Sequence, residues 1–171
     1  RITWSKAKSI VIKSYTCFDK RFGEIVEKFF DNSWIDARVL KGKTSGAFSH
    51  PTVPSCNPKI LLNFQGKIRD VMTLAHELGH GVHQFLANRN GVLLADTPLT
   101  LAETASVFGE MLTFKSLLNS AKSISERKLL LRSKIEDMLN TVFRQIAFFK
   151  FERELHFKRS NEELTDDQIC K

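Results

Sequence analysis

The feature that most constrains this chain is a pair of histidines four residues apart, His76 and His80, with Glu77 directly after the first. On an α-helix, residues four apart lie one turn above each other, so both imidazoles can converge on one Zn²⁺. Glu77 then stands beside the metal, where its carboxylate can take a proton from an attacking water. The competing interpretation is a chance pair of helical histidines beside a solvated glutamate. The surrounding residues have to decide between the two.

The residues around this motif favour a helix from Ile68 to Ala87. The segment lacks proline, and its apolar residues recur at helical spacing as one stripe, formed by Val71, Leu74, Ala75, Leu78, Val82 and Phe85. At about 100° per residue, this stripe lies nearly opposite His76 and His80. The sequence therefore predicts a helix that buries its back and presents the histidines to a cleft.

A catalytic zinc site needs a third protein ligand, and Glu103 is the best candidate. Leu86 stands six residues after His80, where an extended histidine motif would place its third ligand. His83 shares the face of His76, but helix geometry separates the two by about 10 Å along the axis. We therefore expect His83 to be structural or to line the cleft.

Glu103 lies on a second predicted helix, which Thr97 and Pro98 open as a capping hydroxyl and a proline at the first helical position. The loop over residues 88–96 is long enough to return the chain antiparallel and bring Glu103 to the histidines. The neighbours of Glu103 are small and permit close helix approach: Ala102, Thr104, Ala105 and Ser106. The expected buried face of this helix is an apolar stripe on its other side, formed by Leu101, Ala105, Phe108 and Leu112.

Glu110 and Ser106 are expected on the same side of this helix as Glu103. From there Glu110 could accept a proton from a ligand imidazole and so orient it. Exposure to solvent, the usual fate of a helical glutamate, is an equally open interpretation of Glu110.

Two stretches, Val71 to His80 and Ala95 to Glu110, closely resemble the oligoendopeptidase F family of thimet-oligopeptidase-like zinc peptidases. The upstream stretches Gly46 to Ser55 and Ile60 to Phe64 are also similar, and the likeness runs from about residue 15 to about residue 165. The resemblance implies a mainly α fold with a small antiparallel β region, the zincin-type catalytic core of a larger α-helical oligopeptidase.

The resemblance also implies a set of roles. One Zn²⁺ per chain would be held by His76, His80 and Glu103, and Glu77 would be the general base. Short peptide substrates would lie extended along a sheet edge, a form of β-strand addition, beside Gly46, Ala47, Phe48, Ser49 and His50.

The chain departs from the family pattern in two respects. Asn57 precedes Pro58 where the family typically has a histidine before the proline, so a contact in the cleft is altered. Tyr15 is the single tyrosine, so the tyrosine-rich and histidine-rich region that helps to stabilise the oxyanion in the family is missing. We therefore expect an incomplete zinc endopeptidase. The alternatives are a non-catalytic zinc-binding remnant or split-gene subunit, and a helical interaction module without metal.

We expect one partial catalytic domain over residues 1–171. Its parts are helices over 1–32, a small β region over 33–65, the zinc-site helices over 66–120, and a long helix with the start of a further one over 121–171. A helix from Ser125 to about Arg159 would be about 50 Å long, more than a domain of this size can cover. Its packing partners are expected to include missing N- and C-terminal parts of the same enzyme.

Composition argues against several other classes of protein. The net charge of +7 is spread over predicted helix surfaces and accompanies no nucleic-acid recognition motif. No run of about 18 apolar residues suits a membrane span, and the start from Arg1 to Ser5 lacks a signal-peptide pattern. The odd number of cysteines, without metal-ligand spacing, favours reduced thiols and a cytoplasmic location.

Overall fold

The computed structural model describes residues 1–170, which fall into two compact units, 1–120 and 121 onward. The first unit contains five α-helical or 3₁₀ segments and a small sheet, in the order α1 (Trp4–Phe18), α2 (Lys20–Asp31), β1 (Ile35–Asp36), β2 (Phe48–His50), β3 (Lys59–Leu61), α3 (Ile68–Ala87), η1 (Asn88–Asn90) and α4 (Leu99–Ser120). The mainly α class with a small β region is therefore confirmed. That all 171 residues form one partial domain stays a prediction.

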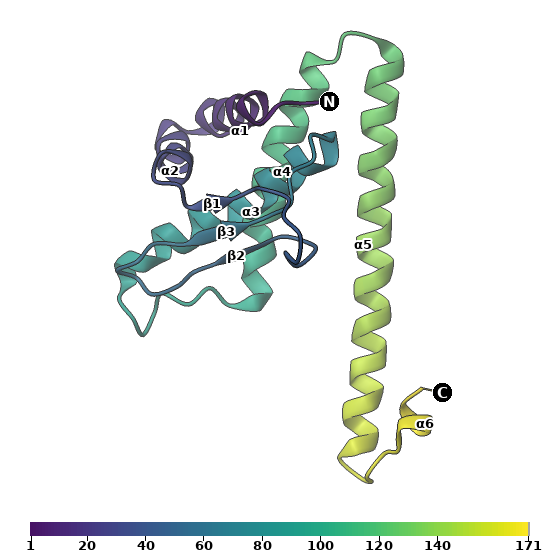
Figure 1. The fold of residues 1–171 in the computed structure, drawn as a ribbon. Coiled ribbons are helices and arrows are strands. Elements are labelled where there is room, and N and C mark those ends of the chain that lie inside the picture. Colours follow the sequence, from purple (N-terminus) through teal and green to yellow (C-terminus); the bar gives the residue numbers. More distant parts are fainter. Residues whose placement is uncertain (171) are drawn as a thin grey trace. The chain divides into compact units, whose positions relative to one another are not determined.

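Helices α1 and α2 form a hairpin that packs on the rest of the first unit (Figure 1). Each begins at a side-chain cap: the Thr3 hydroxyl accepts the Lys6 N–H at 3.3 Å, and the Asp19 carboxylate accepts the Arg21 N–H at 2.8 Å. Such caps satisfy backbone donors that the first helical turn leaves without a partner. The hairpin buries apolar side chains that form much of the core: Ala7, Val11, Tyr15, Ile25, Val26 and Phe29.

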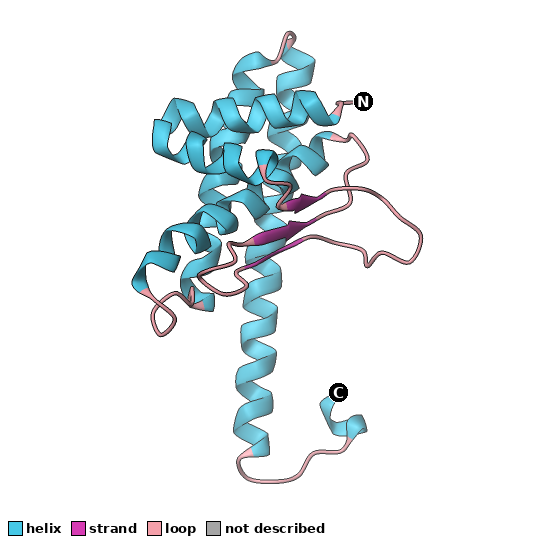
Figure 2. Cartoon of the chain, turned by 60° about the vertical axis from the view of Figure 1, so that its left-hand side comes forward, coloured by secondary structure: helices cyan, strands magenta, loops and turns pink. Residues whose placement is uncertain are grey.

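The sheet has the strand order β1-β3-β2 and lies along one side of the helices (Figure 2). Strand β2 runs antiparallel to β3, as expected, with Ser49 opposite Ile60. Strand β1 runs parallel to β3, with Ile35 opposite the same Ile60, so the expectation of a wholly antiparallel region is wrong. The physical reason lies in the connections. Residues 51–58 reverse the chain directly from β2 into β3, whereas the longer loop 37–47 lets β3 insert between β1 and β2.

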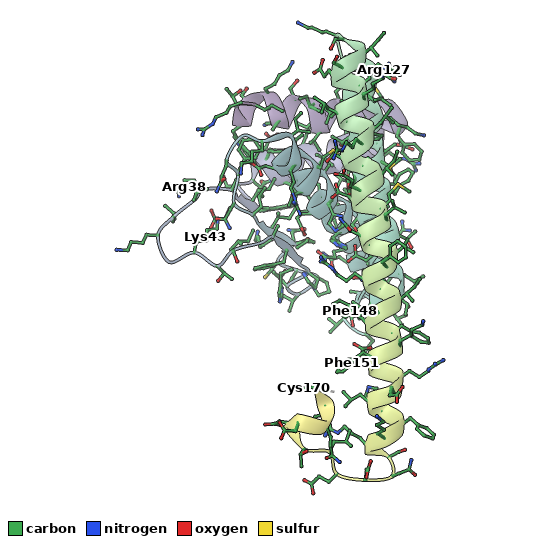
Figure 3. All side chains as sticks on the ribbon, turned by 90° about the vertical axis from the view of Figure 1, so that its right-hand side faces the viewer. Arg38, Lys43, Arg127, Phe148, Phe151 and Cys170 are labelled. Atoms are coloured by element: carbon green, nitrogen blue, oxygen red, sulfur yellow. The ribbon has the colours of Figure 1, made fainter. Side chains whose placement is uncertain are left out.

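A buried lysine holds the loop between β1 and β2, which carries Arg38 and Lys43 (Figure 3). The Lys43 ammonium donates to the carbonyls of Asp36, Arg38 and Leu62 at 3.1, 2.8 and 2.9 Å. It also pairs with the Asp36 carboxylate at 3.1 Å, and its side chain is 7 % exposed. A buried ammonium needs such partners. These bonds hold the loop between β1 and β2 against the sheet.

Helix α3 begins and ends where the apolar spacing predicts, at Ile68 and Ala87. The Asp70 carboxylate accepts the N–H groups of Gln65 and Lys67 at 2.8 and 2.9 Å and so fixes the start of the helix. The predicted stripe is the buried face: Val71, Leu74, Ala75, Leu78 and Val82 are all at most 3 % exposed. At about 1.5–3 kcal/mol for each large apolar side chain buried, this stripe is what holds α3 in the core.

Helix α4 buries a different face from the predicted one. Leu101 and Phe108 are 57 % and 40 % exposed, whereas Ser106 and Thr113 are fully buried. The reason is a close approach of α3 and α4: a Cβ added at Gly79 would lie 2.5 Å from the carbonyl oxygen of Ala105. Only small residues fit at a crossing this tight, so small and polar residues replace the apolar stripe at this contact.

The second unit is built on one long helix, α5 (Ile124–Arg159), which begins at a Ser123 side-chain cap. A short helix, α6 (Asp166–Ile169), follows a capping box formed by Thr165 and Gln168. The α5 stripe is at least 40 % exposed at each of Leu131, Ile135, Met138, Val142 and Ile146. Phe148 and Phe151 also lie on α5 with exposed rings (Figure 3). Among residues 1–170, the structure contains no helix long and apolar enough to cross a membrane.

Candidate metal centre

Helix α3 places His76 and His80 side by side on successive turns. Their ring centroids lie 5.0 Å apart, with the ring planes at 83° to each other. Both side chains are partly buried, at 27 % and 15 % exposure. The buried stripe on the opposite face of α3 turns these imidazoles towards α4, which is the arrangement that the apolar spacing predicts.

Helix α4 brings Glu103 to these two rings. The Glu103 Oε2 atom lies 3.3 Å from His76 Nε2 and 3.7 Å from His80 Nε2. Donor atoms of the three residues all lie within 4.8 Å of one another, and this is the group in the described chain that could hold a metal ion. In tetrahedral zinc sites, bonds of about 2.0–2.2 Å place ligand atoms about 3.4 Å apart. The spacing and the donor types therefore fit Zn²⁺.

Two further side chains of α4 support this group. The Ser106 hydroxyl, fully buried, lies 2.6 Å from Glu103 Oε2 and 3.1 Å from the Glu103 carbonyl oxygen, and can donate to either. Glu110 Oε2 lies 3.3 Å from His76 Nδ1, and the Glu110 side chain is 18 % exposed. A proton on Nδ1 would be donated to this carboxylate, which leaves the Nε2 lone pair facing Glu103. Of the two interpretations of Glu110, the structure therefore shows a partly buried contact with the imidazole rather than a fully solvated side chain.

Glu77 has an environment that makes its carboxyl group a weak acid. The residue is 6 % exposed, and burial raises its pKa to about 7. The positive charge of His76 opposes this increase, while the negative charge of Glu103 adds to it. A carboxyl group with a pKa near 7 can both take up and release a proton at neutral pH.

The two imidazoles differ in basicity. Burial by itself would lower the pKa of His76, but the hydrogen bond with Glu110 and the charges of three glutamates outweigh it and raise that pKa. Burial lowers the pKa of His80, although the charge of Glu103 opposes the change. A metal binds only neutral imidazole. In this site a proton therefore competes with a metal chiefly at His76.

His83 does not join the group of ligand atoms. Its Nδ1 atom is buried and has no hydrogen-bond partner among the residues described. This agrees with a cleft-lining or structural histidine, although that role stays a prediction.

The segment Gly46–His50 forms the outer strand of the sheet and its approach. In β3, the N–H groups of Ile60 and Leu62 point to β1, where they bond Trp34 and Asp36 carbonyls at 2.8 and 2.9 Å. Because the backbone groups of successive residues in a strand point to opposite sides, the N–H and C=O groups of Lys59 and Leu61 point to β2, where they lie opposite His50 and Phe48. The backbone N–H and C=O of Ser49 therefore point away from β3, to the free edge of the sheet.

Gln84, which sequence reasoning missed, ties this edge strand to α3. The Ser49 hydroxyl donates to Gln84 Oε1 at 2.8 Å, and Gln84 Nε2 donates to the Ser49 carbonyl at 3.3 Å. Gln84 is 6 % exposed and lies two turns after Glu77 on the same helix. A glutamine inside an amphipathic helix usually faces solvent, so no periodic pattern could have identified it.

Several known peptidases are similar to this chain. The model of peptidase family M3 matches residues 6–171 of this chain. Oligopeptidase PepF of Bacillus subtilis is 31 % identical over 171 residues, which are 99 % of this chain and 25 % of that protein. The chromosomal oligoendopeptidase F of Lactococcus lactis subsp. cremoris is 36 % identical over 140 residues, 81 % of this chain and 23 % of that protein. The chain thus spans about a quarter of the length of the curated relatives it matches.

Two solved structures have the same arrangement of elements. A candidate peptidase of Chlamydophila abortus, 29 % identical, superposes with a TM-score of 0.78 over 92 % of this chain and 27 % of that one. A candidate oligoendopeptidase F of Bacillus anthracis superposes with a TM-score of 0.76 over 95 % of this chain and 29 % of that one. At 18 % identity, the second likeness concerns the fold alone.

Proposed function

This chain belongs to peptidase family M3, and we propose that its first unit holds the metal centre and the general base of a zinc-dependent endopeptidase for short peptides. The observation that carries the proposal is the position of Glu103, whose carboxylate comes from α4 to within 3.3 and 3.7 Å of His76 and His80 Nε2. Although the Glu103 side chain is 62 % exposed, its carboxylate is directed at both rings and not away from them. The names of the relatives, oligopeptidase and oligoendopeptidase, supply the substrate class.

In this proposal His76, His80 and Glu103 are the protein ligands of one Zn²⁺. When bound, Zn²⁺ would polarise the scissile carbonyl and make water more acidic. Glu110 would hold the Nδ1 proton of His76, and Ser106 would orient the Glu103 carboxylate through its 2.6 Å hydrogen bond. Partners of this kind fix the direction of a ligand's lone pair before the metal arrives.

Glu77 is the proposed general base. It directly follows His76 on α3, and its pKa of about 7 allows it to accept a proton from the attacking water. The same carboxyl group would then deliver that proton to the departing amine of the cut peptide. Its low exposure keeps bulk water from competing for this proton.

A substrate peptide would add to the free edge of β2. At that edge Ser49 offers its backbone N–H as a donor, while its carbonyl already accepts a long 3.3 Å bond from Gln84. We propose that Gln84 sets the position of this edge relative to the zinc ligands, since it joins Ser49 to the helix that carries His76 and His80. The Phe48 side chain, half exposed, offers apolar contact to the peptide beside this point.

A second candidate is a zinc-binding chain that does not turn over substrate without a further segment. The observation that favours it concerns the single tyrosine: Tyr15 is 1 % exposed, so its hydroxyl cannot reach a substrate. Loss of one oxyanion donor typically lowers the rate by a factor of about 10²–10³. We propose that this chain alone is at most weakly active, and that the missing parts of the same enzyme restore activity when supplied.

The three cysteines, exposed and free in the structure, support the cytoplasm as the proposed location. Reduced thiols are the rule in that compartment.

The test is metal content measured together with cleavage of a quenched fluorescent peptide, for the wild type and Glu77→Gln. The proposal predicts one zinc per chain in both proteins, and hydrolysis, alone or after adding the complementary segment, only in the wild type. Zinc without turnover in any combination would favour the non-catalytic candidate. An identical melting temperature with and without zinc would contradict both, because a bound ligand must stabilise the fold.

A further inference from the structure

We propose that Tyr15 is a positioning residue for the metal centre, whose hydroxyl sets the separation of α3 and α4 at the level of His76. The inference rests on the proposed zinc site, because its consequence is a change in metal affinity. Tyr15 itself belongs to α1, outside the two helices that carry the ligands. It touches neither substrate nor metal.

The first contact of Tyr15 is with α3. Its hydroxyl donates to the carbonyl oxygen of Ala75 at 2.8 Å, and Ala75 directly precedes His76. The residue is 1 % exposed, and burial raises the pKa of Tyr15 well above its ordinary value, so the hydroxyl stays protonated and remains a donor. A buried hydroxyl bound to a backbone carbonyl has a fixed direction, unlike a solvated one.

The second contact of Tyr15 is with α4. A Cβ added at Gly109 would overlap the Tyr15 hydroxyl, and would lie 2.7 Å from Tyr15 Cζ and 3.0 Å from the Ala75 carbonyl oxygen. The tip of the tyrosine ring therefore occupies the space that a side chain at Gly109 would fill. Gly109 directly precedes Glu110, whose carboxylate lies 3.3 Å from His76 Nδ1.

These two contacts place the Tyr15 hydroxyl between α3 and α4. It touches the residue before His76 on one helix and the residue before Glu110 on the other, and the next residues on each helix contact each other. One turn further along α3, Gly79 meets the α4 backbone directly, with room for no side chain between them. The crossing is thus held at two levels, by direct contact at Gly79 and by the Tyr15 hydroxyl at Gly109.

The hydroxyl is separable from the rest of the side chain. The ring of Tyr15 packs in the core with Val11 and Ala7. A phenylalanine ring would fill the same space. Only the hydroxyl bonds Ala75 and spaces α3 from α4. Tyr15→Phe should therefore leave a folded protein whose helices can move relative to each other at His76. Loss of a partner that orients a ligand typically weakens metal binding 10–100-fold, and because this partner acts through the backbone we expect about tenfold.

Ser14 offers a matched control. It is the neighbouring residue on α1, is 5 % exposed, and its hydroxyl donates to the Ile10 carbonyl at 2.7 Å. Ser14→Ala thus also removes a buried hydroxyl bond from α1, but that bond stays within the helix. If Tyr15 acts only through the stability of α1, the two variants should behave alike.

The experiment measures zinc affinity of the chain by competition with a chromophoric chelator, and folding by circular dichroism and melting temperature. We expect Tyr15→Phe to bind zinc about tenfold more weakly and Ser14→Ala to bind it as the wild type does. Gly109→Ala should also weaken zinc binding, because its methyl group would overlap the Tyr15 hydroxyl. Tyr15→Phe in the same chain should relieve only part of this clash, because the methyl group would still lie 2.7 Å from Cζ. Wild-type zinc affinity in Tyr15→Phe, or equal losses in Tyr15→Phe and Ser14→Ala, would overturn the proposal.

A measurement without metal separates this inference from the zinc proposal. In nuclear magnetic resonance spectra of the metal-free chain, Tyr15→Phe should shift the ring resonances of His76, and Ser14→Ala should not. If the wild type bound no zinc but this shift appeared, the zinc function would fail while the positioning role stood. If the wild type bound zinc but His76 kept its resonances in Tyr15→Phe, the positioning role would fail alone.

Discussion

Glu103 Oε2 lies 3.3 Å from His76 Nε2, a contact between residues of different helices that depends on how α3 crosses α4. The crossing is close because Gly79 lies between the two histidines on α3 and meets the α4 backbone at Ala105. Because Gly79 has no side chain, α4 can approach α3 closely enough for Glu103 to reach His76 and His80. The geometry of the metal centre therefore depends on how α3 and α4 pack in the core.

Gly79→Ala is expected to damage the metal centre through this crossing. Its Cβ would lie 2.5 Å from the Ala105 carbonyl oxygen and 2.6 Å from Ser106 Cα, which are backbone atoms that cannot rotate away. We expect a loss of about 1–3 kcal/mol in the free energy of unfolding, together with a large loss of zinc affinity, measured by urea denaturation and zinc titration.

Gly81→Ala is the control, because its Cβ would instead meet the side chains of Phe29 and Ile60, the nearest at 2.7 Å and away from α4. It should lower stability as well, but spare zinc affinity in the molecules that remain folded. Equal loss of zinc binding in Gly79→Ala and Gly81→Ala would mean that general destabilisation explains both.

Ser106→Ala tests whether the orientation of Glu103 matters. The variant removes the 2.6 Å hydrogen bond to Glu103 Oε2 without changing charge. We expect zinc binding about tenfold weaker, at the lower end of the range for partners of metal ligands. Ser120→Ala, which removes an exposed hydroxyl bond to the Ser116 carbonyl on the same helix, should have no effect on zinc affinity. The idea fails if chelator competition gives the two variants the same affinity.

The pKa of Glu77 predicts how the stability of the metal-free protein depends on pH. Folding raises this pKa from 4.5 to about 7, so between these values the folded state holds a proton that the unfolded state has lost. Stability therefore falls as pH rises from about 4.5 to about 7. At about 1.4 kcal/mol for each pKa unit, the free energy of unfolding should fall by about 3 kcal/mol over this range.

The measurement compares wild type with Glu77→Gln in urea denaturation at a series of pH values, with a chelator present. The raised pKa of His76 acts in the same direction and the lowered pKa of His80 acts in the opposite one, but both are present in the two proteins. The difference between the curves then reports Glu77 together with the part of the His76 shift that the Glu77 charge causes. Parallel curves across this pH range would contradict the assignment.

Gln84 is expected to affect peptide binding and not zinc. Gln84→Glu keeps an acceptor for the Ser49 hydroxyl but loses the donor to the Ser49 carbonyl, and Gln84→Met loses both at similar volume. In a Glu77→Gln background, where a peptide is not consumed, we expect several-fold weaker peptide binding for Gln84→Glu and a larger loss for Gln84→Met. Zinc affinity should be unchanged. Peptide affinities equal to that of the background protein would exclude Gln84 from the substrate edge.

The helices and their ligand-bearing face could be predicted because they follow from local spacing. The apolar residues of α3 specify both its bounds and the direction of His76 and His80, and Thr97 and Pro98 foretell the start of α4 within two residues. Glu103 could be selected because its neighbours are small. These are properties of single helices, and periodicity reports them well.

Properties that depend on contact between elements could not be predicted in this way. The stripe through Leu101 and Phe108 looks like a buried face, yet the glycine at position 79 makes the small, polar side of α4 the one that packs on α3. The parallel pairing of β1 with β3 depends on loop paths that no periodicity reports. Tyr15 and Gln84 act across the core, so only the folded arrangement reveals what their polar atoms bind.

The most direct test of the central claim is zinc titration of the metal-free chain for the wild type, Glu103→Ala and His83→Ala. We predict one zinc per chain for the wild type and for His83→Ala, with similar affinity, and at least a hundredfold weaker binding for Glu103→Ala. Full affinity in Glu103→Ala, or its loss in His83→Ala, would contradict the assignment of His76, His80 and Glu103 as the ligands.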